Sequence, residues 1–203
     1  MKIVYSIVVC ALVALHANGS AIAGDDSEAK RLATQVCGHC HGPNGDSISP
    51  TFPRLAGQSA EYTEAQLKAF KEHKRGDRFA QAYMWGMASQ LDEDTIKKLS
   101  TYYAAEKPKT GRAGDAARVA RGKTIYENGI PEVGVLACTS CHGADGEGKA
   151  AMPRLAGQHP DYLVKQMVAY KTLQRANAPV MQAIADKMTV DHMRDVAEYV
   201  ASR

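Results

Sequence analysis

The chain has 203 residues, of which 25 are Lys or Arg and 22 are Asp or Glu, so its formal net charge is +3. Nothing in this balance suggests a nucleic-acid-binding protein, which would carry a clustered basic face. The length allows one medium-sized domain or two small ones.

The first residues have the layout of a secretory signal peptide. Lys2 gives a positive start, residues 3–15 form an apolar run, and residues 21–23 (Ala-Ile-Ala) form a small-x-small cleavage site. The alternative is a retained membrane anchor, but this run is shorter than the roughly 20 residues that span a bilayer. We therefore predict a cleaved signal peptide over 1–23 and a mature protein in the periplasm, without a membrane span. Peripheral association with a membrane stays open.

The mature chain begins with a helical pattern. Asp26 or Ser27 can cap a first helix that ends at Cys37, and Ser59 can cap the next one. The last helix of this half is predicted over 92–104, and its inward-facing positions are Ile96, Leu99 and Tyr103. Helices this short need tertiary packing to persist.

The sequence then repeats itself with a period of about 100 residues, which fits a duplicated domain. PRLAGQ occurs at 53–58 and again at 153–158, and the register extends over 53–71 and 153–171. Residues 106–114, rich in Pro, Gly and charge, are typical of a linker. The predicted organisation is an N-terminal domain over 24–106, a linker over 107–114 and a C-terminal domain over 115–203.

The second copy carries the same helical pattern. Its first helix is predicted to start at Asp115, with Val119, Gly122, Ile125 and Tyr126 on one face. His159 takes the cap position before the next helix, and Pro160 follows at the first helical residue, where its missing N–H is tolerated. The last helix is predicted over 190–202, with three residues inward: Met193, Val196 and Val200.

Each copy contains Cys-x-x-Cys-His, at 37–41 and at 138–142. The two thiols can form thioethers with one haem, and the following His then lies under the iron as its proximal ligand. A zinc site would need four ligands, whereas each copy offers three. Disulfides would not explain the adjoining His, and chance does not explain two motifs that coincide with the repeat. The motifs therefore predict two covalently bound haem c groups, which would also supply the core that short helices lack.

The sixth iron ligand separates a carrier from a catalyst, because a closed His/Met site suits electron transfer and an open position permits ligand binding. Most methionines are core filler. Only Met84 and Met181 coincide in the two registers, so we predict these two as ligands. The other pairs place a methionine opposite an aliphatic residue, which indicates packing: Met87 with Ile184, Met188 with Leu91, and Met193 with Ile96.

Each copy resembles a class I cytochrome c domain, because it combines Cys-x-x-Cys-His, a proline–leucine–glycine turn and a methionine before the last helix. The tandem arrangement with two PRLAGQ motifs resembles the dihaem cytochrome c4 family over essentially all of 24–203. This resemblance implies an all-α fold of two cytochrome c-like domains, each with a few short helices wrapped around a covalent haem. It also implies a pseudo-twofold axis between the domains, with the haems close to their interface.

The resemblance implies roles for particular residues. The proline carbonyls of Pro53 and Pro153 would accept the proximal histidine N–H, which fixes the ring and makes it a better donor. Arg54 and Arg154 share a repeat position, where each either bonds a haem propionate or is a plain surface arginine. The implied thioether and axial positions are Cys37 and Cys40 with His41 and Met84, and Cys138 and Cys141 with His142 and Met181.

The two copies also differ. Residues 72–78 are about three residues longer than their counterpart on the repeat alignment, residues 128–137 lengthen the second copy, and Met87 is a rival ligand beside Met84. Such differences either give the haems different potentials, or reserve one domain for docking, or reflect neutral loop drift.

The predicted function is a periplasmic electron carrier and not an enzyme. It would take single electrons from a membrane or soluble donor, such as a bc1-type complex, and pass them to a terminal oxidase or reductase. Two alternatives stay open. One is a dihaem cytochrome subunit of a larger complex, such as a flavin-dependent sulfide dehydrogenase. The other is a dihaem peroxidase-like enzyme in which one iron loses its sixth ligand.

Overall fold

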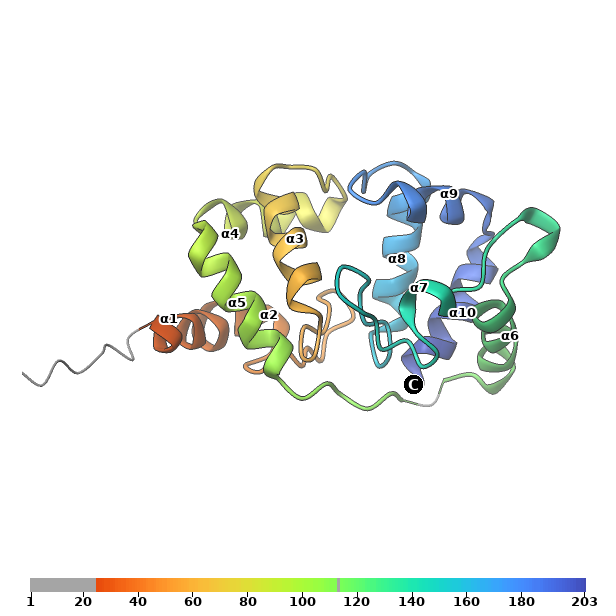
Figure 1. Ribbon diagram of the computed structural model, residues 1–203, viewed down its shortest axis with the longest axis horizontal. Helices are drawn as coiled ribbons and strands as arrows, with labels where there is room; N and C mark the ends of the chain where they lie inside the picture. The colour runs from red at the N-terminus through yellow and green to blue at the C-terminus, as the bar shows by residue number, and fades with distance from the viewer. Residues whose placement is uncertain (1–24, 113) are drawn as a thin grey trace, which may run out of the picture.

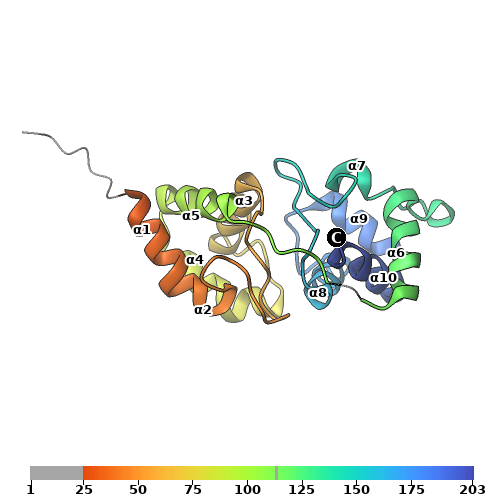
Figure 2. The same cartoon turned by 90° about the horizontal axis from the view of Figure 1, so that it is seen from below.

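The protein is all-α, as predicted, and a computed structural model describes residues 25–112 and 114–203. The signal peptide predicted over 1–23 lies outside the described residues. Two groups of helices lie side by side, α1 to α5 in one and α6 to α10 in the other, and a linker joins them along one edge (Figures 1 and 2). Within the described residues, extended pairing is limited to isolated bridges. The exact ends of the linker, predicted at 107 and 114, stay a prediction.

Side-chain caps explain where the main N-terminal helices begin. The Ser59 side chain accepts the Tyr62 N–H at 3.2 Å, and Asp92 accepts the Thr95 N–H at 2.8 Å. The first helix begins at Asp25, ahead of both predicted caps. The elements in order are α1 (Asp25–Leu32), the π-helical turn η1 (Ala33–Cys37), α2 (Gly38–His41), α3 (Ala60–Lys71), the π-helical turn η2 (Ala80–Met84), α4 (Trp85–Ser89) and α5 (Glu93–Ala105).

The C-terminal domain follows the same plan. Asp115 caps its first helix by accepting the Arg118 N–H at 2.8 Å, and Pro160 opens α8 directly after His159. Its elements are α6 (Ala116–Asn128), the 3-10 turn η3 (Pro131–Val133), α7 (Thr139–His142), α8 (Pro160–Lys171), α9 (Pro179–Lys187) and α10 (Val190–Ala201).

The last helix of each domain fills the core, as its pattern predicted. Ile96, Leu99 and Tyr103 of α5 are buried, and Met193, Val196 and Val200 of α10 are buried in the C-terminal core. No helix within the described part of the chain is both long and apolar enough to cross a membrane.

The linker is bonded to both domains. The Lys109 Nζ pairs with Asp46 of the N-terminal domain at 2.7 Å, and the Arg112 N–H donates to the carbonyl of Ala201 at 3.1 Å. It also passes close to both PRLAGQ motifs. A Cβ on Gly157, whose φ is +72°, would lie 2.5 Å from the Lys109 carbonyl oxygen, so only glycine fits there.

Candidate haem sites and the interface between them

The Cys-x-x-Cys-His motifs end in the two short helices α2 and α7, and the first cysteine of each motif directly precedes its helix. None of the four motif cysteines is paired in a disulfide; Cys37 and Cys138 are half-buried, and Cys40 and Cys141 are exposed. Burial raises the pKa of Cys138 to about 11, so its thiol is protonated near neutral pH. Among the described residues, no three His, Cys, Asp or Glu side chains gather as a metal site, which leaves the zinc alternative without a site.

Each motif histidine is fixed by a proline carbonyl. The Nδ1 of His41 lies 2.8 Å from the carbonyl oxygen of Pro53, and the Nδ1 of His142 lies 3.0 Å from that of Pro153. A carbonyl only accepts, so Nδ1 must carry the proton, and Nε2 is left with a free lone pair. Burial lowers the pKa of both rings, and the bond to the proline offsets this only in part. Both histidines are therefore neutral, which is the form that binds a metal.

The two methionines predicted as ligands are half-buried in their own domains. Met84 ends η2 and packs against the buried cluster of Phe70, Ala80 and Ala88, whereas Met181 lies in α9 against the C-terminal core. Phe52 connects the two sides of the N-terminal site, since its ring centroid is 6.0 Å from that of His41 and 5.3 Å from that of Tyr83, beside Met84.

The other methionines divide between core and surface. Met188 and Met193 are buried in the C-terminal core, as their repeat partners indicated. The packing predicted for Met87 is wrong for this structure, because the side chain is 42% exposed. Met87 lies beyond Met84, in the short helix α4.

The residues present fit a covalent haem in each domain. Each domain offers two unpaired thiols, a neutral histidine with a free Nε2, and a half-buried thioether. Two arginines also keep a buried Nε without a partner in the described structure, Arg75 and Arg154. An unsatisfied buried cationic donor suits an anionic acceptor such as a haem propionate.

Arg54 and Arg154 occupy the same repeat position but have different surroundings. The Arg54 guanidinium pairs with Asp46 at 3.3 Å and donates to the carbonyl of Gly157 in the other domain. Arg154 instead keeps its buried Nε free of protein acceptors. The propionate role predicted for both arginines stays a prediction, and the structure favours Arg154 over Arg54 for it.

A buried arginine pair at the domain interface was missed by the sequence analysis. Arg75 and Arg175 are only 4% and 2% exposed. Gln166 accepts from both guanidinium groups at 2.7 Å. Arg175 also donates across the interface to the Tyr62 hydroxyl at 2.7 Å. Both arginines stand at one position of the repeat, which is the signal that could have found them.

This pair makes the interface electropositive. Asp77 is the carboxylate bonded to Arg75, at 3.4 Å, and it is the one carboxylate that bonds this buried arginine pair within the described residues. Burial raises the pKa of the Tyr62 hydroxyl, but Arg175 and Arg75 outweigh that effect and bring the pKa below its ordinary value. An anionic group at this interface would be stabilised.

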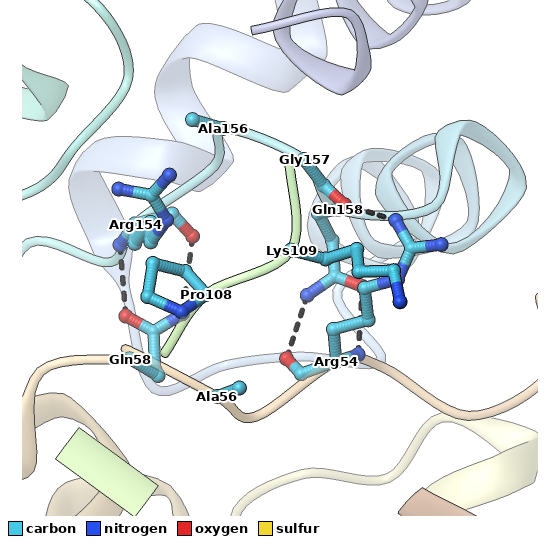
Figure 3. A pocket seen from close by; sticks show the side chains of 9 residues that line it. All are labelled: Arg54, Ala56, Gln58, Pro108, Lys109, Arg154, Ala156, Gly157 and Gln158. Atoms are coloured by element: carbon cyan, nitrogen blue, oxygen red, sulfur yellow. Dashed lines mark hydrogen bonds between the residues drawn. The ribbon is translucent and has the colours of Figure 1, made fainter. Parts of the chain in front are cut away.

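The repeated PRLAGQ motifs also meet at the interface (Figure 3). The Gln58 side chain bonds the backbone of Arg154, accepting its N–H at 2.8 Å and donating to its carbonyl at 3.0 Å. Gln158 bonds the backbone of Arg54 in the same way, at 2.9 Å for both contacts. We call these four bonds the glutamine clasp. The sequence showed the motif twice, but not that each copy binds the other.

The two longer segments lie in different places. Within 72–78, the Gly76 N–H donates to the carbonyl of Gln174 at 2.7 Å, so this loop meets the other domain. Residues 128–137 form a turn closed by Ile130 and Val135, which projects away from the interface (Figure 1). The choice between docking and loop drift stays open for both.

The family model, the relatives and the solved structure that follow are all cytochromes c. The family model described as Cytochrome c matches residues 27–104 and 119–203. Cytochrome c-552 of Acidithiobacillus ferridurans is 40% identical over 95% of this chain and 84% of its own length. Cytochrome c4 of Azotobacter vinelandii is 35% identical over 93% and 94%. The solved structure of Acidithiobacillus ferrooxidans cytochrome c4 is 42% identical, with a TM-score of 0.77 over 82% of this chain and 98% of that one.

A further relative carries a different name. The thiosulfate dehydrogenase electron acceptor of Thiomonas intermedia is 33% identical to this chain, over 82% of the chain and 78% of its own length.

Proposed function

Because the chain belongs to the dihaem cytochrome c4 family, we propose that it carries single electrons between respiratory partners in the periplasm. It is a dihaem electron-transfer cytochrome with two covalently bound haem c groups. In the proposal, a bc1-type complex is the donor and a terminal oxidase or reductase is the acceptor.

We propose that Cys37 and Cys40 hold one haem and that Cys138 and Cys141 hold the other. When bound, each haem supplies a one-electron iron couple, and the side chains set its ligands. His41 and Met84 would close one iron, and His142 and Met181 the other. The observation that carries this proposal is the histidine–proline contact, because it leaves Nε2 free to ligate in both domains.

A carrier is supported over a peroxidase-like enzyme by the methionines. Each domain has a half-buried methionine at the same position of the repeat, so neither domain is set apart as an open site. Iron with both axial positions filled transfers electrons without binding a substrate.

The first test is a visible spectrum of the dithionite-reduced mature protein, with haem counted per chain, before and after carbon monoxide is added. We expect two low-spin haems per chain and no change with carbon monoxide. A shift equivalent to one haem would show an open iron and contradict the carrier proposal. The mass of the periplasmic protein tests the predicted cleavage after Ala23 in the same preparation.

A second candidate is the electron acceptor of a thiosulfate dehydrogenase, which the relative from Thiomonas intermedia favours. The test is to compare the rate at which purified thiosulfate dehydrogenase and thiosulfate reduce the protein with the rate for a bc1-type complex and quinol. Faster reduction by the dehydrogenase supports the second candidate. Purification together with a flavoprotein would instead support the sulfide dehydrogenase subunit.

A further inference from the structure

One peptide group in each domain lies between a proximal histidine and the other domain. The carbonyl of Pro53 accepts the Nδ1–H of His41 at 2.8 Å. The N–H of the same peptide group, on Arg54, donates to the Oε1 of Gln158 in the C-terminal domain at 2.9 Å. The peptide group is thus bonded on both of its polar atoms.

The arrangement is reciprocal. The carbonyl of Pro153 accepts from His142 at 3.0 Å, and the N–H of Arg154 donates to the Oε1 of Gln58 in the N-terminal domain at 2.8 Å. Each domain therefore bonds, through one glutamine, the peptide that holds the other domain's histidine.

Both glutamines are held in one orientation. Each is 7% exposed, and each Oε1 also accepts the N–H of the following residue, Ser59 at 3.0 Å or His159 at 3.1 Å. The side-chain Nε2 donates to the arginine carbonyl on the far side, as Figure 3 shows. A buried acceptor fixed in this way acts on the peptide continuously.

We propose that Gln158 lowers the midpoint potential of the haem in the N-terminal domain. Gln58 would lower that of the haem in the C-terminal domain. Hydrogen-bond chains polarise one another, so a bond accepted from the peptide N–H makes the same peptide's carbonyl a stronger acceptor. The histidine then becomes more basic and a better iron donor. A better donor favours ferric iron and lowers the potential. Gln58 and Gln158 are positioning residues, and the inference rests on the proposed function because it takes His41 and His142 as ligands.

The test compares Gln158→Leu and Gln58→Leu in the full haem-loaded protein. In the reduced, low-spin state, NMR can observe the Nδ1–H proton of each proximal histidine. We expect Gln158→Leu to move the His41 proton upfield and to leave the His142 proton in place, and Gln58→Leu to do the reverse. The midpoint potential, assigned by following the methyl resonances of each haem, should rise for the haem in the domain that was not mutated.

A second variant separates tuning from packing. Gln158→Glu keeps an oxygen that accepts from Arg54 but loses the donor to the Arg54 carbonyl. We expect it to move the His41 proton downfield, opposite to the leucine variant, whereas a purely structural role would move it the same way in both.

The control is His159→Ser, which places the residue of the first copy in the second. It removes a different cross-domain bond, from His159 Nε2 to the Ser47 carbonyl at 2.9 Å. The hydrogen bonds of the peptide groups Pro53–Arg54 and Pro153–Arg154 stay intact. We expect neither histidine proton to move in this control. An unmoved His41 proton in Gln158→Leu, or equal shifts of both protons, would overturn the inference.

Failure of the inference and failure of the proposed function give different results. Carbon monoxide binding by the unmutated protein contradicts the function. If the protein does not bind carbon monoxide and the glutamine variants leave the histidine proton shifts unchanged, only the inference is contradicted.

Discussion

Asp195 is a buried carboxylate on α10, and two arginines of α6 bind it. Arg121 makes two bonds to it, at 2.7 Å and 2.9 Å, and Arg118 makes a third at 3.1 Å. The hydrogen bond from Arg121 is the largest of the effects that hold the pKa of Asp195 below its ordinary value. The folded protein therefore favours the charged carboxylate more than the unfolded chain does.

A lowered carboxyl pKa has a defined effect on stability. The stabilisation is complete above the ordinary pKa of Asp, about 3.9, and is lost as the pH falls through the lower folded value. We expect Asp195→Asn to lower the free energy of unfolding at pH 7 by about 1–2 kcal/mol, because both arginines stay partly solvated. The difference from wild type should shrink as the pH drops below 4. Urea unfolding at several pH values measures it.

The matched control for this variant is Asp191→Asn. Asp191 pairs with Arg194 at 3.2 Å on the same helix, but both side chains are exposed. Its replacement should change the free energy of unfolding by less than about 0.5 kcal/mol. If Asp195→Asn lost the same stability at every pH, the ionised carboxylate would not be the stabilising form.

At the scale of elements, α6 and α10 cross at Gly122. A Cβ there would lie 1.9 Å from the backbone oxygen of Asp195, so the two helices approach only because this residue has no side chain. We expect Gly122→Ala to destabilise the C-terminal domain by about 1–3 kcal/mol through overpacking. Thermal unfolding of the haem-loaded protein measures the loss.

Gly86 is the control for this substitution, because it also lies in a helix and has no atom within 4 Å of an added Cβ. Alanine is the better helix former by about 1 kcal/mol, so Gly86→Ala should stabilise where Gly122→Ala destabilises. A Gly122→Ala protein as stable as wild type would mean that α6 can move off α10 without loss.

The regular helices were largely predictable from sequence, because caps and apolar spacing are local signals. Ser59 and Asp115 cap the helices they were expected to cap. The two π-helical turns were not predictable, since one extra residue in a turn leaves no mark in a 3.6-residue pattern. They end at Cys37 and at Met84, and such turns often mark functional sites. Within the described residues both lie in the N-terminal domain, so they distinguish the two domains.

At the scale of the whole molecule, the sequence offered candidate residues for the haem sites but none for the interface between the domains. A motif such as Cys-x-x-Cys-His indicates haem attachment by itself. A residue that is identical in both repeats, by contrast, has one of two roles. It either serves the same task in each domain, as His41 and His142 do, or it lies where each copy binds the other. Gln58 and Gln158 belong to the second kind. Only the pseudo-twofold arrangement tells these roles apart, and a linear sequence does not contain it.

Arg175 provides the strongest test of this interface. It donates across the boundary to Tyr62 at 2.7 Å and to Gln66 at 2.8 Å, while its guanidinium carbon lies 4.5 Å from the ring centroid of Tyr170. Arg175→Met keeps an unbranched apolar stem but removes the guanidinium, which leaves buried acceptors unpaired at a cost of about 1–3 kcal/mol. We expect calorimetry to show one cooperative transition for the wild type and two for this variant, since its domains would then unfold separately.

Arg78 is the control for the arginine variant, because it lies in the same interface-facing loop as Arg75 but is exposed. Arg78→Met should keep the single transition of the wild type. The glutamine clasp remains in Arg175→Met, so the result also ranks the two parts of the interface. Two separated transitions would mean that the buried arginines couple the domains. A single transition at an unchanged temperature would mean that the glutamine clasp is enough to couple the domains and that Arg175 is not needed for it.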